Sequence, residues 1–248
     1  DWEFIPDWFS GFERGEGQGS PVRLPHTVQK CPQHYTDHNA YQMVCGYRRK
    51  LELGEELEGK RLFLQFDGAA HIATVYVNGK ALATHRTGYT GFRVDITEAA
   101  RLGEDNLLAV RLDTTENPQI PPFGYVIDYL TYGGLYRDVN LICVNNVHFD
   151  VETWGTPGIH VTPIVEGENA KVTVEAFVAN QGDAQIRYTI CDKEEAVVAQ
   201  AETADTTATF AIENVHLWHG RKDPYLYCCE AELYEGDAVI DSVCTRFG

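Results

Sequence analysis

The feature that most restricts the fold of this sequence is a series of short β-type runs that alternate with turn signals. Residues 73–77 are β-branched and aromatic, and Asn78-Gly79 follows them directly. Asn-Gly after such a run predicts a type I′ β-hairpin, because both residues tolerate a positive φ angle. Further predicted strands in this half are residues 62–66, 107–112 and 139–142. Short strands that recur with turns between them favour a β-sandwich or a barrel.

Helical periodicity is weak along the whole chain. Residues 96–102 could form one helical turn, with Asp95 or Thr97 as its cap, but no more. We therefore predict an all-β protein.

The second half of the chain has a simpler alternation. Val172, Val174, Ala176 and Val178 fall on one face of a strand. The other runs of this kind are residues 186–190, 207–210, 225–234 and 238–243. About seven strands in roughly 100 residues is the size of an immunoglobulin-like sandwich. We expect a domain boundary near residues 145–147, with domains at 1–145 and 146–248.

Charge and composition exclude several classes of protein. Lys plus Arg number 20 and Asp plus Glu 37, so the formal net charge is −17. This charge repels phosphate backbones and anionic membrane surfaces, so we expect neither nucleic acid nor a membrane as a partner. No uncharged apolar run is long enough for a transmembrane helix. No basic and apolar leader is visible at the start of the chain, and its ends look cut, as in a fragment of a longer protein. We expect a cytoplasmic location, which the cysteine usage favours.

The seven cysteines show no metal-binding spacing. Their number is odd and no CxxC pair occurs, so a zinc site is not supported. Cys143, Cys191, Cys228 and Cys244 lie in apolar or alternating runs, where a free cysteine behaves as a small hydrophobic residue. We expect reduced, buried and inert thiols, as is usual inside cells.

Residues 113–138 differ from the rest of the chain. Their first part, residues 114–123, is proline-rich and has no periodicity, and loops as long as residues 113–138 are usually functional or disordered. The aromatic side chains of Phe123, Tyr125, Tyr129, Tyr132 and Tyr136 argue against disorder. We predict an ordered functional loop.

Within this loop, Asp128 lies among aromatic residues. A carboxylate in such surroundings can accept hydrogen bonds from sugar hydroxyls while a ring stacks on the apolar face of the sugar. An aspartate that caps a turn would give the same local pattern. No GxSxG, HExxH or P-loop motif is present, and His34 and His38 have the context of two loop histidines rather than metal ligands.

Several motifs follow one another in order along the chain. They are 66–68 with 75–79, 85–92 with 95–97, 106–110, and 132–139. Together they resemble the N-terminal sugar-binding domain of glycoside hydrolase family 2, which includes β-galactosidases, β-glucuronidases and β-mannosidases. Residues 24–27 and 47–49 look like the opening of that domain. Residues 217–220 and 223–227 look like the end of the family's immunoglobulin-like domain, and residues 246–248 resemble its junction with the catalytic TIM barrel.

This resemblance implies a jelly-roll sandwich (galactose-binding-like) followed by an immunoglobulin-like sandwich. In the family, the acid/base and nucleophile glutamates belong to the barrel, so no residue of this chain is expected to be catalytic. The chain would be the accessory part of a retaining β-galactosidase-type hydrolase and would be inactive by itself. Its expected partners are a β-galactoside or related β-glycoside and its own TIM barrel. Family members are often oligomeric, so a homo-oligomer is also a candidate assembly.

The resemblance also assigns site residues. Asp128 stands six residues before Gly134, and an aspartate at that place in the family's galactosidases contacts the sugar and helps to bind a sodium ion. Asp128 is therefore the first candidate for substrate binding and for sodium in the complete enzyme. Asn117 and Tyr129 are weaker substrate-binding candidates. No cofactor is expected in this chain alone, whereas Na⁺ or Mg²⁺ could serve the complete enzyme.

Other residues receive structural expectations. Arg137 and Asp138 point to opposite faces of a strand and should brace the loop or a domain contact. Trp218 is predicted to be a buried anchor of the second sandwich. Ala69-Ala70-His71 departs from the apolar residues that the family usually has there.

Two readings of function remain open at this point. The first is the accessory portion of a glycosidase, and the second is a stand-alone carbohydrate-binding module. The charge of −17 weakly disfavours an anionic sugar such as a glucuronide, which favours a neutral galactoside.

Overall fold

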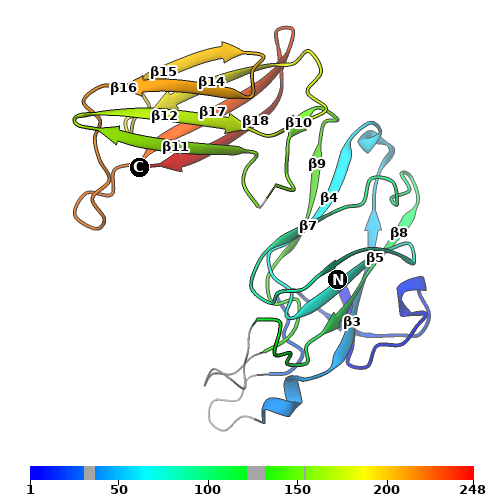
Figure 1. Cartoon of the computed structure of the whole chain (residues 1–248). Helices are drawn as coiled ribbons and strands as arrows, with labels where there is room; N and C mark the ends of the chain where they lie inside the picture. The colour runs from blue at the N-terminus through cyan, green and yellow to red at the C-terminus, as the bar shows by residue number, and fades with distance from the viewer. Residues whose placement is uncertain (31–36, 122–131, 154) are drawn as a thin grey trace. The chain divides into compact units, whose positions relative to one another are not determined.

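The computed structural model describes residues 1–30, 37–121, 132–153 and 155–248. It divides into two compact units, Asp1–Cys143 and Val144–Gly248, and both are built from antiparallel β-strands (Figure 1). In the described part of the chain, no helix has both the length and the apolar character needed to cross a membrane. The all-β prediction is confirmed.

The first unit is a sandwich of two sheets. One sheet has the order β2-β1-β3-β8-β5-β6, and the other has the order β7-β4-β9. The bounds of the first sheet are β1 (Trp2–Ile5), β2 (Ser20–Val22), β3 (Val44–Glu52), β5 (Ile72–Val77), β6 (Lys80–His85) and β8 (Asp105–Asp113). Those of the second are β4 (Arg61–Phe66), β7 (Phe92–Asp95) and β9 (Val139–Val144). The described residues of this unit also form short 3₁₀ turns at η1 (Phe12–Arg14), η2 (His38–Tyr41) and η3 (Glu55–Leu57).

Alternation along the strands fills the core of this unit. Ala73, Val75 and Val77 of β5 are fully buried, while the residues between them are half-buried. Leu62, Leu64 and Phe66 of β4 lie in the same hydrophobic cluster. A period of two puts every second side chain on the inner face, which is why the sequence pattern located these strands.

The local predictions in this unit also agree with the structure. Asn78 and Gly79 have φ angles of 52° and 80°, as a type I′ hairpin between β5 and β6 requires. A single helical turn follows β7, because the Ala100 amide donates to the Ile96 carbonyl at 2.8 Å. Asp95 caps this turn by accepting a hydrogen bond from the Thr97 amide.

The second unit has the two-sheet arrangement of an immunoglobulin-like domain. One sheet has the order β11-β12-β16, and the facing sheet has the order β15-β14-β17-β18. The bounds are β11 (Ile159–Glu166), β12 (Asn169–Ala176), β14 (Gln185–Cys191), β15 (Val197–Thr203), β16 (Thr207–Ile212), β17 (Tyr227–Glu235) and β18 (Ala238–Phe247). A short pair, β10 (His148–Phe149) and β13 (Val178–Ala179), lies beside them. Inward-facing residues of both sheets, including Val172, Val174, Ile186 and Tyr188, form one core.

The expectation that all cysteines are reduced and buried is wrong. Cys228 and Cys244 form a disulfide, and Cys143 is exposed. Cys228 lies on the outer face of β17, whereas its neighbour Cys229 faces the core and is fully buried. In the β17–β18 register, Glu230 is opposite Cys244, which makes Cys228 and Cys244 diagonal neighbours on one face. The sequence pattern did not reveal this pairing because it depends on the register.

The prediction for Trp218 is also wrong. Its side chain is 56% exposed, and the residue lies outside the strands, next to a β-bridge between His219 and Asp223. The core of this unit is filled instead by strand residues such as Tyr188 and Tyr227. An aromatic residue near the end of a sandwich domain is therefore not necessarily one of its core anchors.

Candidate functional site

The candidate site is the long loop that joins β8 to β9. Asp128, the first candidate for sugar contact, and Tyr129, a weaker candidate, lie outside the described residues, so their roles remain predictions. Asn117 and both ends of the loop are described. Hydrogen bonds at these two ends form a frame that holds the loop.

The outgoing end of the loop is fixed by Thr114, which is 1% exposed. The Thr114 hydroxyl donates to the Tyr41 carbonyl at 2.5 Å and accepts a hydrogen bond from the Met43 amide at 3.0 Å. The Thr114 amide in turn donates to the Met43 carbonyl at 2.9 Å. The loop thus starts from a buried position tied to residues 41–43.

Asn117 forms a compact turn just after this anchor. Its Oδ1 accepts a hydrogen bond from the Gln119 amide at 2.9 Å, and its carbonyl accepts one from the Ile120 amide at 3.2 Å. Ile120 is buried and holds the turn against the unit. The Asn117 amide oxygen is therefore engaged within its own turn, where it shapes the loop.

The returning end of the loop is fixed by two glycines. Gly134 exchanges two backbone hydrogen bonds with Ala70, and the Gly133 carbonyl accepts one from the Val28 amide at 3.0 Å. Gly134 has a φ angle of 135°, and a Cβ atom there would come within 2.4 Å of the His26 carbonyl oxygen. This position therefore requires glycine for both its backbone angle and its close backbone neighbour.

Tyr136 and Arg137 extend the bracing beyond the glycines. The Tyr136 hydroxyl donates to the Gly88 carbonyl at 2.5 Å. Arg137 donates to the Asp67 carbonyl at 3.1 Å, and its guanidinium lies 5.2 Å from the centre of the Tyr136 ring. The Asp67 amide donates to the Asp138 carbonyl at 3.0 Å. These contacts connect the returning end to the loops around residues 67 and 88.

His71 is a buried polar residue at the base of the same loop. It is 2% exposed, and its Nδ1 lies 3.3 Å from the Thr115 carbonyl oxygen. Its Nε2 is buried without a hydrogen-bond partner among the residues that the structure describes. Burial lowers the pKa of His71, and the smaller opposing effects of Thr115, Glu116 and Asp113 do not reverse this. In the sequence, His71 stands out only as a departure from the family pattern.

Together these contacts define what the frame can do chemically. Most of its hydrogen bonds end on backbone atoms, so the frame fixes the path of the chain into and out of the loop. Across the described ranges, no three His, Cys, Asp or Glu side chains are grouped so that they could hold a metal ion. The sodium ligand predicted at Asp128 lies outside those ranges.

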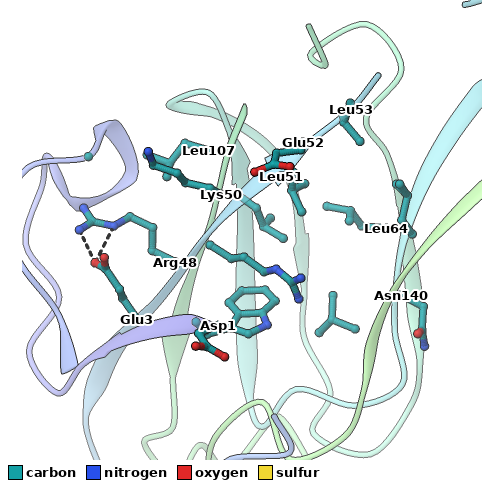
Figure 2. A pocket seen from close by; sticks show the side chains of 16 residues that line it. Asp1, Glu3, Arg48, Lys50, Leu51, Glu52, Leu53, Leu64, Leu107 and Asn140 are labelled. Atoms are coloured by element: carbon teal, nitrogen blue, oxygen red, sulfur yellow. Dashed lines mark hydrogen bonds and ion pairs between the residues drawn. The ribbon is translucent and has the colours of Figure 1, made fainter. Parts of the chain in front are cut away.

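A cavity of about 870 Å³ opens elsewhere in the first unit, between β3 and β8 on one side and β4 and β9 on the other (Figure 2). Its lining includes the buried or half-buried side chains of Leu51, Leu53 and Leu64. Arg48 and Glu3 also line it and form an ion pair. Asn117, the one predicted substrate-binding residue within the described ranges, does not line this cavity.

The fold and the framed loop define a class of protein: two β-sandwich domains, of which the first presents a braced loop. Comparison with known families gives the particular group. Residues 17–145 match the model of the glycosyl hydrolases family 2 sugar binding domain, and residues 157–248 match the model of glycosyl hydrolases family 2. The chain belongs to glycosyl hydrolase family 2.

Individual relatives carry two different activities in their names. A β-galactosidase of Thermoanaerobacter pseudethanolicus is 30% identical over the whole chain, which matches 34% of that protein. A β-glucuronidase of Bacteroides fragilis is 32% identical over 94% of the chain, which matches 35% of that protein. The structure of a Bacteroides uniformis β-glucuronidase superposes with a TM-score of 0.85 at 26% identity, covering 99% of this chain and 31% of that one. The chain thus spans about a third of these relatives.

Proposed function

We propose that the complete protein hydrolyses terminal β-galactosides, and that this chain supplies a sugar-contacting loop but no catalytic carboxylate. The observation that carries the proposal is the loop between β8 and β9, which hydrogen bonds fix at both ends. A loop braced in this way can hold polar side chains at a fixed place, as sugar recognition requires. Membership of a glycosidase family and the sugar binding domain match support it.

Each predicted residue has a separate role in this proposal. The Asp128 carboxylate accepts hydrogen bonds from sugar hydroxyls, and the Tyr129 ring stacks on the apolar face of the sugar. Asn117 shapes the entry to the loop through its turn. Asp128 is also the residue we propose for a sodium ion in the complete enzyme, and the sugar contact does not depend on that ion.

The choice of galactoside over glucuronide rests on charge. A net charge of −17 disfavours an anionic substrate at long range, although screening limits the effect to about 8 Å at physiological ionic strength. The named relatives include enzymes of both kinds. A direct comparison of nitrophenyl β-galactoside and nitrophenyl β-glucuronide hydrolysis by the complete protein tests the choice. Higher kcat/KM for the glucuronide would overturn it.

The role of Asp128 is tested in the same assay. Asp128→Ala and Asp128→Asn should each lower kcat/KM by about tenfold or more, because the sugar hydroxyls lose a charged acceptor. Asp237→Asn, in the turn between β17 and β18, is the matched control and should leave kcat/KM unchanged. If the substitutions at Asp128 and Asp237 change kcat/KM equally, the proposed role of Asp128 is wrong. Residues 1–248 alone should not hydrolyse either substrate.

The alternative function is a stand-alone sugar-binding module, which the match to a sugar binding domain favours. It predicts that residues 1–248 bind free galactose at millimolar concentration or below. NMR chemical-shift changes on titration with galactose, lost in Asp128→Ala or Tyr129→Ala, would support this alternative. Spectra that do not change on addition of galactose would contradict the stand-alone module, and the loop would then be one part of a larger pocket.

A further inference from the structure

An exposed apolar surface lies on the second unit, in the segment between β16 and β17. Leu217 is 50% exposed and Trp218 is 56% exposed, and Leu226 follows after a tight turn at 36%. We call the surface formed by these three residues the Trp218 surface. Large neighbouring apolar side chains that remain exposed usually mark a contact with another surface.

The segment that carries this surface is well ordered by local contacts. The His219 amide donates to the Asp223 carbonyl at 2.7 Å, closing a turn that contains Gly220. His216 pairs with Asp223 at 2.6 Å, and its ring stacks on Tyr225 with 4.0 Å between the centroids. These contacts hold the segment in place without using Leu217 or Trp218. Both side chains are thus left available to a partner.

The end of the described chain lies against the same surface. A Cβ atom at Gly248 would come within 2.8 Å of the Trp218 Cβ and 3.0 Å of the Leu226 Cδ2. Figure 1 shows the C-terminus beside the loop between β16 and β17. Any polypeptide joined to Gly248 therefore starts directly beside the Trp218 surface.

We propose that the Trp218 surface is the docking site for the part of the complete protein that follows residue 248. The matched relatives are about three times as long as this chain, so a partner of the right size is available within the same polypeptide. An attached partner needs little affinity, because the linkage gives it a high effective concentration. The inference rests on the proposed function only in that this following part is the catalytic one.

Hydroxyl-radical footprinting with mass spectrometry tests the contact directly. Trp218 oxidation should be about tenfold slower in the complete protein than in residues 1–248, because an interface core excludes solvent as a protein interior does. Val197 of β15, which is 60% exposed, is the control and should be oxidised at equal rates in both. Equal rates at Trp218 would overturn the proposal. Protection in residues 1–248 that grows with protein concentration would also overturn it, because the occupant would then be a second copy.

A variant tests what the contact contributes. Trp218→Ser in the complete protein should speed limited proteolysis just after residue 248 by about tenfold, because central aromatic residues often dominate an interface. Val197→Ser should not change that rate. In residues 1–248 alone, Trp218→Ser should leave the melting temperature unchanged, since the side chain is exposed there. Equal proteolysis of both variants contradicts the docking site.

These outcomes separate this inference from the proposed function. A complete protein without glycosidase activity would overturn the proposed function. Protection of Trp218 in that same protein would still support the docking site. Full activity together with an unprotected Trp218 would overturn the docking site alone.

Discussion

The backbones of Ala70 and Gly134 exchange two hydrogen bonds, each 3.1 Å long, at the base of the loop between β8 and β9. The bridge joins the segment before β5 to the returning end of the loop. It therefore couples the path of the predicted sugar-binding segment to the core of the first unit.

Gly134→Ala should destabilise the first unit by about 3 kcal/mol or more, because the new Cβ would overlap the His26 carbonyl and the φ angle suits only glycine. Gly59→Ala is the matched control, since Gly59 also has a positive φ angle but open space around it. Gly59→Ala should lower the free energy of unfolding by only about 1 kcal/mol. Urea unfolding measures both changes, and equal losses would contradict the close approach.

Thr114→Val should lower the free energy of unfolding by about 1–3 kcal/mol, because it removes the buried hydroxyl that bonds to the Tyr41 carbonyl and the Met43 amide. Thr115→Val is the control. The Thr115 hydroxyl is exposed and, within the described ranges, bonds to the nearby Asp113 side chain, so this change should lower the free energy of unfolding by about 0.5 kcal/mol or less. Chemical denaturation of the two variants measures the difference. Similar costs would mean that Thr114 is not an anchor.

His71 should make stability depend on pH. Burial holds the pKa of folded His71 below its ordinary value of 6.5, so the unfolded chain takes up a proton before the folded chain does. The contribution of His71 to the free energy of unfolding is therefore fully present above pH 6.5. It is lost as the pH drops from 6.5 through the lower pKa of the folded state. Burial also lowers the pKa of His26 and His85, so the contribution of His71 is the difference between wild type and variant.

His71→Asn should flatten this part of the pH dependence. An asparagine can still donate to the Thr115 carbonyl but does not titrate. Urea unfolding at pH 7.5 and pH 5.5, on wild type and variant, gives the comparison. An unchanged slope would show that His71 titrates equally in the folded and unfolded chain.

Reduction of the Cys228–Cys244 disulfide should lower the free energy of unfolding of the second unit by about 3 kcal/mol, because the bond closes a loop with a sequence separation of 16 residues. The double variant Cys228→Ser with Cys244→Ser should not respond to reductant. Cys191→Ser, which changes a free cysteine opposite Cys228, should respond like the wild type. Thiol titration of the denatured chain with and without reductant checks the bond, since an absent disulfide gives equal counts.

Much of the fold could be predicted because its signals are local. The alternation in residues 73–77 and 172–178 located strands, and Asn78-Gly79 located a hairpin turn. Each signal lies within a few residues, where the two-residue period and the allowed φ angles decide the structure. The family resemblance gave the position of the loop and the identity of Asp128 as a candidate, but it did not reveal the frame around it.

The remaining features depended on contacts between distant residues. Ala70 meets Gly134, Cys228 meets Cys244, and Trp218 lies outside the core, and no run of sequence around any of them specifies these outcomes. These outcomes depend on strand register and on which side chains fill the core. The sequence by itself therefore determined the all-β class, the family and the site loop. Only the tertiary structure decided which residues anchor that loop, which cysteines pair and which apolar surface stays open, because these properties arise when separate strands are brought together.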